Sequence, residues 1–349
     1  MAADEVHKGK APRTRVTLAD VAAHAGCSAA AVSLWVNGKS DGRLTAASAA
    51  RIEAAVKELG YVPNRIAQRL ARGASRSVAY LFPGAKYGVF FGSIVDGVAE
   101  RLGPSWDVSF YDAKHDPAHP DLSPIDRALA SDPRALLISA PTEDVLARAA
   151  DLPVPGVVID APSTPDNLSL VSFAMRPAVA DMAKTLRDLG HRRVAYVAFR
   201  GESLSLATRR ELVRGELETV GISTVDDDLE LSSLDIEPTA EAFAGIWPRW
   251  KAAGVTAVVC ADDRHTWGLI AASRTLPLSI PEDFSLVGFN DSEPCALLTP
   301  SVSAIRLSAY DIGEAAAAAL EHLVTGGAPQ RTEVQTTFER RASVGPAPV

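Results

Sequence analysis

The side chains that could bind a partner by charge gather near the beginning of this sequence. Residues 1–77 carry twelve Lys and Arg side chains and six Asp and Glu side chains, a net charge of +6. The whole chain of 349 residues carries −8, so the remainder carries −14. Lys and Arg bind phosphate groups, whereas an acidic body is repelled by them. The basic segment is therefore predicted to contact nucleic acid.

Short helices are predicted to position these basic side chains. Thr17 and Asp20 have capping-box spacing ahead of an apolar helical pattern, and Gly26 ends this first helix. Ser28 can cap a second helix over residues 29–36. A connector this short suits the bend of a helix-turn-helix better than two antiparallel helices.

A third helix and the segment after it complete the predicted module. Thr45 can cap residues 46–59, whose apolar side chains form one stripe, and Gly60 can close this helix. Asn64 can then cap a short helix ending at Leu70 and flanked by arginines. Because so short a helix is marginal in isolation, we expect it to need a partner to stay folded.

The composition and the missing motifs exclude several other classes of protein. Two or three soluble globular domains are expected from the length, with 47% hydrophobic and 22% charged residues. No apolar run approaches ~20 residues, and the polar start lacks a secretory signal. Cys27, Cys260 and Cys295 have neither disulfide-scaffold nor metal-site spacing, which favours the reducing cytoplasm.

Motifs of catalysis and cofactor binding are also missing. The sequence contains no HExxH, no GxSxG elbow, no Walker loop and no GxGxxG that opens a helix. We therefore expect no enzyme activity, no metal site and no cofactor. A solute-binding protein of a transporter is the alternative from another class, and the basic amino-terminal segment argues against it.

From residue 77 onward, apolar strand patterns alternate with helical patterns. This alternation predicts parallel sheets with helices on both faces. The predicted strands are 78–82, 108–112, 135–139, 156–160, 194–198, 257–260 and 286–289. The predicted helices are 90–102, 179–189, 209–220, 267–274 and 311–325. So many strands predict two doubly wound α/β subdomains, with a ligand cleft where the carboxyl ends of the strands converge.

Two stretches of the amino-terminal module resemble the headpiece and hinge of the lactose-repressor family. They are TLADVAAHAGCSAAAVSLWVNG at 17–38 and RIEAAVKELGYVPNRIAQRLARG at 51–73. The resemblance implies a dimer that places the helix beginning near Ser28 in the major groove of a pseudo-palindromic operator. It also implies that the segment from Asn64 to Leu70 is a hinge helix. Leu70 would insert into the minor groove, and Ala67 would let the paired hinge helices approach closely.

The expected DNA-reading face departs from the family pattern. Positions 29, 30 and 34 commonly hold polar or basic residues in the family, whereas this chain has small or apolar ones. Such side chains can touch a thymine methyl but cannot form the bidentate hydrogen bonds that distinguish guanine. Specificity is then expected to rest on nearby polar or basic residues and on deformability of the kinked DNA. The predicted DNA contacts are Thr17, Ser28, Ala29, Ala30, Ser33, Leu34, Asn37, Lys39, Arg43, Tyr61, Asn64, Arg65, Ala67, Gln68 and Leu70.

The part of the chain from 77 to 345 resembles the periplasmic-binding-protein-like core of the same family. The clearest matches are DLGHRRVAYV at 188–197, TAVVCADD at 256–263 and IPEDFSLVGFND at 280–291. The resemblance implies a small effector, commonly a sugar or nucleobase. It places Asp262 and Asn290 at effector-contacting positions, with Asp and Asn exchanged relative to the family. Arg209 is the effector anchor if Gly221 sets the register, and Leu212 takes that place in the alternative register.

Other cleft positions leave alternatives open. Aromatic side chains could cover a ring of the ligand or belong to the core, and Asp263 and Asp291 could cap the helices that follow their strands. Ala174 and Met175 replace an acidic-polar pair of the family. A regulator without an effector, or one controlled by a partner protein, is therefore the alternative within this class. The predicted effector contacts are Tyr87, Phe90, Arg209, Asp262, Trp267 and Asn290.

The domain organisation follows from these assignments. Residues 1–15 are expected to be a flexible basic tail, 16–62 the headpiece, 63–76 the hinge helix and linker, and 77–349 the effector-binding and dimerisation core. The stretch DAPSTPD at 160–166 is expected to cross between subdomains. Subdomain 1 would then comprise 77–162 and 292–322, and subdomain 2 would comprise 163–291 and 323–349. Together these features predict a cytoplasmic homodimer that represses transcription from double-stranded operator DNA under control of a small polar effector, a carbohydrate or nucleoside.

Overall fold

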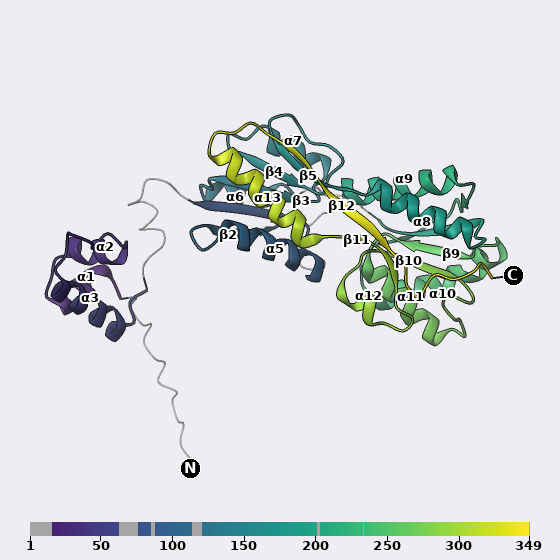
Figure 1. Cartoon of the computed structure of the whole chain (residues 1–349), viewed down its shortest axis with the longest axis horizontal. Helices are drawn as coiled ribbons and strands as arrows, with labels where there is room; N and C mark the ends of the chain where they lie inside the picture. Colours follow the sequence, from purple (N-terminus) through teal and green to yellow (C-terminus); the bar gives the residue numbers. More distant parts are fainter. Residues whose placement is uncertain are drawn as a thin grey trace, which may run out of the picture. The chain divides into compact units, whose positions relative to one another are not determined.

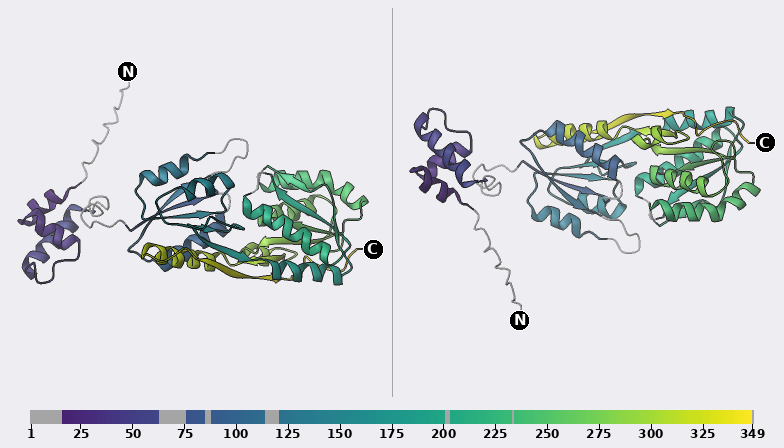
Figure 2. Two further views of the ribbon diagram at one scale, coloured as in Figure 1. Left: turned by 90° about the horizontal axis from the view of Figure 1, so that it is seen from above. Right: turned by 90° about the horizontal axis from the view of Figure 1, so that it is seen from below.

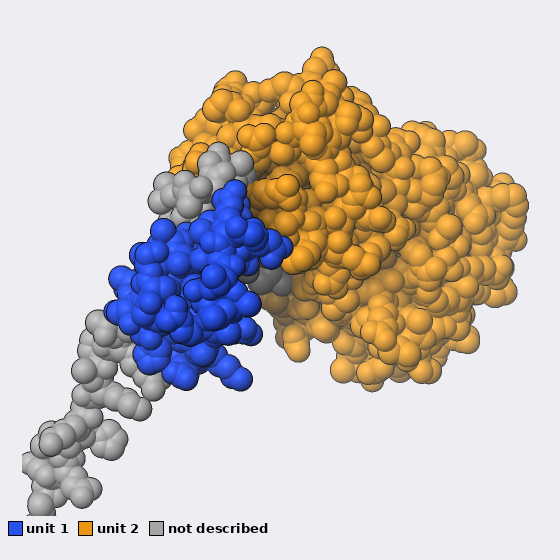
Figure 3. All heavy atoms as spheres, turned by 60° about the vertical axis from the view of Figure 1, so that its left-hand side comes forward, with its two compact units in different colours: residues 1–75 blue, residues 76–349 orange. Residues whose placement is uncertain are grey.

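The chain forms two compact units, residues 1–75 and residues 76–349, which Figure 3 distinguishes by colour. The computed structural model describes residues 16–62, 76–84, 88–113, 121–200, 203–232 and 234–348. The expected tail 1–15, the expected hinge helix and Tyr87 lie outside the described residues. Each unit is described by itself.

The first unit is a three-helix domain (Figure 1). Its helices are α1 (Leu18–Ala25), α2 (Ala29–Val36) and α3 (Ala46–Leu59). The predicted capping box of Thr17 and Asp20 is present, and the side chain of Ser28 accepts a hydrogen bond from the second helix. The chain bends by 109° between α1 and α2, as a helix-turn-helix requires. Val21, Val32 and Ile52 are fully buried where the three helices meet.

The membrane-spanning potential of the described helices is small. No single described helix is long and apolar enough to cross a bilayer, and only α1 and α2 taken together pass by length and composition. These two helices are separated by the sharp bend and share the buried core of the first unit.

The first subdomain of the second unit has a parallel sheet with helices on both faces. Its strand order is β2-β1-β3-β4-β5-β12. The strands are β1 (Ser77–Phe82), β2 (Asp107–Asp112), β3 (Ala135–Ser139), β4 (Gly156–Ile159), β5 (Ser169–Ala174) and β12 (Arg331–Glu339). Helices α5 (Gly88–Leu102) and α13 (Ala309–Val324) pack on one face. Helices α6 (Ser123–Ala130) and α7 (Glu143–Ala150) pack on the other.

The second subdomain repeats this plan with the order β12-β11-β10-β9-β6-β7, while β8 pairs with β6. Its other strands are β6 (Arg193–Phe199), β7 (Ser223–Thr224), β8 (Leu229–Leu231), β9 (Ala257–Cys260), β10 (Ser285–Asn290) and β11 (Ser303–Leu307). Helices α8 (Arg176–Asp188) and α9 (Leu204–Thr219) cover one face. Helices α10 (Ile236–Ala252), α11 (Asp263–Thr275) and α12 (Glu293–Leu297) lie on the other side.

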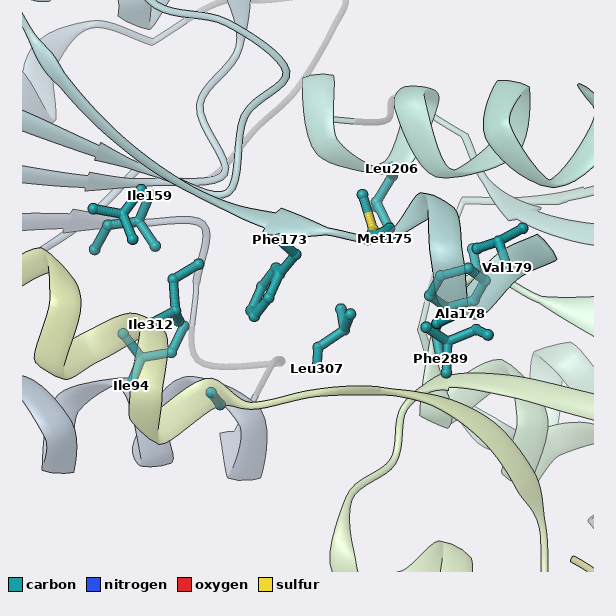
Figure 4. Packing of buried hydrophobic residues seen from close by; sticks show 14 of the residues in the cluster. Ile94, Ile159, Phe173, Met175, Ala178, Val179, Leu206, Phe289, Leu307 and Ile312 are labelled. Carbon is teal, nitrogen blue, oxygen red and sulfur yellow. The ribbon is translucent and has the colours of Figure 1, made fainter. Parts of the chain in front are cut away.

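Strand β12 joins the two sheets, which Figures 1 and 2 show as a single yellow strand continuing between the subdomains. Residues 331–335 pair in parallel with β5, and residues 336–339 pair antiparallel with β11. One cluster of buried apolar side chains likewise extends through both subdomains. It includes Ile94 and Ile312, then Phe173 and Leu307 near the crossing, and Phe289 beyond it (Figure 4).

The crossings between subdomains differ from those expected from the sequence. The chain crosses after β5 at Met175, after β11 at Ser308 and in the middle of β12. The expected boundaries were 162/163, 291/292 and 322/323. The stretch 160–166 instead connects β4 to β5 within the first subdomain. The difference arises because β5 and β11 are short buried strands that the sequence analysis does not predict.

Candidate nucleic-acid interface and ligand cleft

The outer face of α2 is the candidate DNA-reading surface of the first unit. Val32 is the only buried residue of this helix. Ser28, Ala29 and Ala30 are exposed at its beginning, and Leu34 is half-buried. The core of the unit therefore holds α2 through Val32, with Ala31, Trp35 and Val36 partly buried against the same core, and leaves the amino-terminal end of the helix open to a partner.

The polar residues expected near this surface have different surroundings. The amide nitrogen Nδ2 of Asn37 donates to the Ser33 carbonyl oxygen at 2.8 Å and to its hydroxyl at 3.4 Å. Lys39 and Arg43 are exposed in the loop that leads to α3. The two basic side chains are thus free to reach phosphate groups, whereas Ser33 and Asn37 already bind each other.

Two further expected DNA contacts have structural roles. Thr17 is exposed and caps α1. Tyr61 is buried against the three-helix core, because the left-handed Gly60 turns the chain back at the end of α3. The Tyr61 amide donates to the Val56 carbonyl oxygen at 3.0 Å, a pattern that places an apolar side chain against the last turn of a helix.

A small cavity lies between the two subdomains of the second unit, at the carboxyl ends of the strands. The lining residues at these strand ends are Ser139 at the end of β3 and Ala140 after it, Asp160 after β4, Asp262 after β9, and Asn290 at the end of β10. Three of these residues have left-handed backbones, with φ of 43° at Ala140, 57° at Asp160 and 79° at Asn290. Such conformations are costly for residues other than glycine and gather at functional sites.

Arg209 of α9 is the centre of the cavity's polar network. Its Nη2 atom donates to Asp160 Oδ2 at 3.1 Å, and Nη1 donates to Asn290 Oδ1 at 3.1 Å and to the Ala261 carbonyl oxygen at 3.3 Å. The guanidinium also lies 5.5 Å from the centre of the Phe289 ring. Because Arg209 is 3% exposed, these contacts replace nearly all of its hydration.

Asn290 and Asp262 extend this network to a helix terminus. Asn290 Nδ2 donates to Asp262 Oδ2 at 3.0 Å, and Asp262 Oδ1 accepts the Arg264 amide at 2.8 Å. Asp262 therefore caps α11. The sequence analysis had considered this capping role for the next residue, Asp263.

The remaining wall of the cavity is largely apolar. It is formed by Pro83, Phe90, Phe91, Ile94 and Leu206, with the hydroxyls of Ser203 and Ser205. The cavity is partly open, and its volume is about 50 Å³. A cavity of about 150 Å³ is known to hold benzene, so this space accommodates a few water molecules rather than a sugar ring.

The structure brings together four of the predicted effector contacts: Phe90, Arg209, Asp262 and Asn290. Trp267 is not among the lining residues. It lies on α11. Leu212, the alternative to Arg209, packs on the apolar cluster. Met175 is buried in that cluster as well, where the family has a polar residue.

Asp160 is the main lining residue that the sequence analysis missed, together with Ser139. Both stand at the end of correctly predicted strands. The rule that ligands bind at the carboxyl ends of parallel strands would have selected them.

Two carboxylates next to the cavity hold other parts of the second subdomain. Asp263 accepts the Ser292 amide and the Cys295 thiol, each at 3.1 Å, and burial beside Asp262 raises its pKa to about 6. Asp291 accepts a bidentate pair of bonds from Arg341 at 2.5 and 3.0 Å. Neither residue lines the cavity. Among the described residues, no group of three His, Cys, Asp or Glu could hold a metal ion.

Comparisons with known proteins connect both units to one class. The profile of bacterial regulatory proteins of the lacI family matches residues 17–64, and that of a periplasmic binding protein-like domain matches residues 183–344. The HTH-type transcriptional regulator reg1 of Streptomyces lividans is 30% identical over 329 residues, covering 89% of this chain and 91% of reg1. The lactose operon repressor of Escherichia coli is 27% identical over 348 residues, covering 95% and 91%.

Solved structures share the fold. The crystal structure of the lac repressor dimer bound to operator and the anti-inducer ONPF has a TM-score of 0.80 and 24% identity, covering 95% of this chain and 99% of that one. The complex of the transcriptional regulator CelR with cellobiose has a TM-score of 0.66 and 24% identity, covering 95% and 100%.

Proposed function

Because the chain belongs to the LacI family of bacterial regulatory proteins, we propose that it acts in the cytoplasm as a homodimeric repressor that binds operator DNA. The observation that carries this proposal is the first unit, in which α2 buries Val32 in the core and presents its exposed amino-terminal end on a helix-turn-helix. The related lac repressor crystallised as a dimer on its operator. The function is that of a regulator rather than an enzyme.

The two first units of a dimer would each place α2 in a major groove. Ala29 and Ala30 would contact thymine methyl groups, and Lys39 and Arg43 would contact phosphates. The hinge helix from Asn64 to Leu70 would pair with its dimer mate and open the minor groove at the centre of the operator.

A small polar effector in the cavity would modulate this binding. Arg209 and the carboxyl ends of the strands offer donors and acceptors for a sugar or nucleoside, and the related CelR binds cellobiose. A ligand between the subdomains changes their relative orientation, and operator affinity changes with it. Ligand and operator would then alter each other's affinity by the same factor.

Selection of bound DNA from a random pool tests the proposed function. The full-length chain at a stated salt concentration should enrich a two-fold symmetric site, and its affinity should fall steeply with salt. Repeating the selection with a panel of sugars and nucleosides tests effector control. If the selection enriches no two-fold symmetric site, operator binding by a dimer is contradicted.

The hinge role has a test of its own. Leu70→Ala should weaken operator binding and reduce DNA bending, measured by gel mobility of circularly permuted fragments, while circular dichroism stays unchanged. Arg76→Ala, which alters a basic residue beyond the hinge helix, is the control. If the Leu70→Ala variant bends DNA as much as the wild-type protein does, the proposed insertion of Leu70 into the minor groove is contradicted.

The small cavity, whose polar side chains largely bind one another, favours a second candidate function. The polar groups of Arg209, Asn290 and Asp262 bind one another, and about 50 Å³ is free. A regulator controlled by a partner protein, or by no effector, would need nothing more. Operator binding that responds to no metabolite would support this second candidate.

A further inference from the structure

A buried ion pair connects the two subdomains across the cavity. Asp160 follows β4 in the first subdomain, and Arg209 belongs to α9 in the second. Arg209 Nη2 and Asp160 Oδ2 are 3.1 Å apart, and the side chains are 4% and 11% exposed. The protein itself therefore supplies a carboxylate that the guanidinium of Arg209 binds.

The hydrogen bonds of Arg209 leave little for an anion to use. Nη2 is engaged by Asp160, and Nη1 by Asn290 and the Ala261 carbonyl oxygen. Its Nε atom is the buried guanidinium nitrogen without a hydrogen-bond partner among the described residues. Charge-assisted hydrogen bonds are the strong ones, and here the strongest is already made to Asp160.

The charges around the cavity add to this effect. Among the described lining residues, Asp160 and Asp262 are acidic and Arg209 is basic, which leaves a net charge of −1. The other lining residues are apolar, serine or asparagine. An approaching carboxylate or phosphate therefore meets one uncompensated negative charge in a site with little water to screen it.

The cavity is partly open and offers about 50 Å³, so a sugar-sized ligand that binds at Arg209 displaces lining residues, and one that enters between Asp160 and Arg209 separates them. Whatever takes the place between them has to accept from a guanidinium and donate to a carboxylate. A hydroxyl group does both. An ammonium group donates to the carboxylate but cannot accept from the guanidinium, so its advantage over an anion comes from the net charge of −1. A carboxylate or phosphate would satisfy Arg209 but leave Asp160 charged and unpaired.

We propose that Asp160 is a charge filter: by neutralising Arg209 it admits polyhydroxylated neutral or amine-bearing effectors and excludes anionic ones such as sugar acids and sugar phosphates. This inference rests on the effector binding proposed above. It makes Asp160, rather than Arg209, the residue that determines the charge of the ligand.

Sugars that share a ring but differ in charge test the filter. The full-length protein is titrated by calorimetry at fixed pH and salt with glucose, glucosamine, glucuronate and glucose 6-phosphate, and with the matching galactose and mannose series. In any series that binds, the neutral or amino sugar should bind at least about 10-fold more tightly than either anion. An anion that binds as tightly as its neutral counterpart would overturn the filter.

Three variants separate the role of Asp160 from general charge. Asp160→Asn keeps an acceptor and tolerates the left-handed backbone, and it should reduce the preference against anions the most, because it frees Arg209. Asp262→Asn removes a lining charge without touching Arg209 and should reduce the preference less. Asp263→Asn, one residue away and outside the lining, should change it least.

The outcomes are distinguishable from failure of the proposed function. Equal effects of Asp160→Asn and Asp262→Asn would overturn the specific role of Asp160. Should Asp160→Asn fail to fold, the wild-type charge preference and the Asp262→Asn shift still decide the ligand class. If no sugar of any series and no nucleoside of the panel binds, effector binding itself fails and the filter falls with it.

Discussion

The DNA-reading surface and the ligand cavity place their functional residues in opposite environments. On the first unit the candidate contacts at the beginning of α2 and in the loop after it are exposed, and Val32 is the one fully buried residue of α2. In the cavity, Arg209, Asp262 and Asn290 are buried and bind one another. A substitution on α2 is therefore expected to change function alone, whereas a substitution in the cavity changes stability as well.

The difference reflects where the polar groups find their partners. Exposed groups such as Lys39 and Arg43 keep their hydration until DNA replaces it. Water cannot replace a lost hydrogen-bond partner of a buried group. Removing one partner therefore leaves the other unsatisfied and lowers the free energy of unfolding substantially.

Arg209→Ala should have the largest effect. It leaves the Asp160 carboxylate buried without a counterion, and removal of one partner of a buried pair typically costs about 3–5 kcal/mol. Urea denaturation should show this loss in the second unit alone, and release from the operator by an effector should disappear. Adding Asp160→Asn should recover much of the stability but not the effector response. Full stability of Arg209→Ala would contradict the buried pair.

The buried carboxyl of Asp263 should give the second unit a distinct pH dependence. Its pKa is raised from 3.8 to about 6 in the folded chain, so folding takes up a proton between these values. This group's contribution to the free energy of unfolding is therefore present at pH 4 and is lost as the pH rises through 6. The stability of Asp263→Asn relative to wild type should rise by about 2–3 kcal/mol between pH 4 and 7. A pH-independent difference between the two proteins would contradict the raised pKa.

Helices α5 and α13 pack so closely that a Cβ atom added to a glycine at their contact should destabilise the second unit. A Cβ atom on Gly313 would lie 2.2 Å from the Ile94 carbonyl oxygen. Gly313→Ala should therefore cost about 1–3 kcal/mol in thermal or urea unfolding. Gly92→Ala on α5 is the matched control, because nothing lies within 4 Å of its added Cβ, and it should be neutral or slightly stabilising. Equal effects would show that the two helices do not approach so closely.

Helix caps should have the smallest and most local effect. Thr45 accepts the Ser48 amide at 3.2 Å, and Thr45→Ala should destabilise the first unit by about 1 kcal/mol. Thr142 accepts the Val145 amide at 3.4 Å in α7, so Thr142→Ala should act on the second unit only. Hydrogen exchange measured by mass spectrometry resolves the two units. A change in protection that spreads from one unit to the other would show that they are not independent.

The elements of the first unit were predictable because their signals are local. The capping box of Thr17 and the caps at Ser28 and Thr45 each join residues within one turn of helix. Tyr61 was the exception. It was predicted to contact DNA, but the fold buries it, since the turn at Gly60 directs its side chain inward.

The strands of the second unit were also predicted well where they are continuous apolar runs. The predicted strands 135–139 and 257–260 match β3 and β9 residue for residue. Strand β12 was not predicted, because half-buried and exposed positions alternate along it among mostly polar residues. With β5 and β11 missing too, the crossings between subdomains were placed in the wrong loops.

The sequence by itself determined the helix-turn-helix, the alternation of strands and helices, and the position of Arg209 in its helix, because periodicity and capping act over a few residues. Only the tertiary structure decided that Arg209 binds Asp160, 49 positions earlier, and Asn290, 81 positions later. No local pattern records such a pairing. It arises because parallel strands bring their carboxyl ends to one edge, where buried charges must find partners among whatever residues the fold collects.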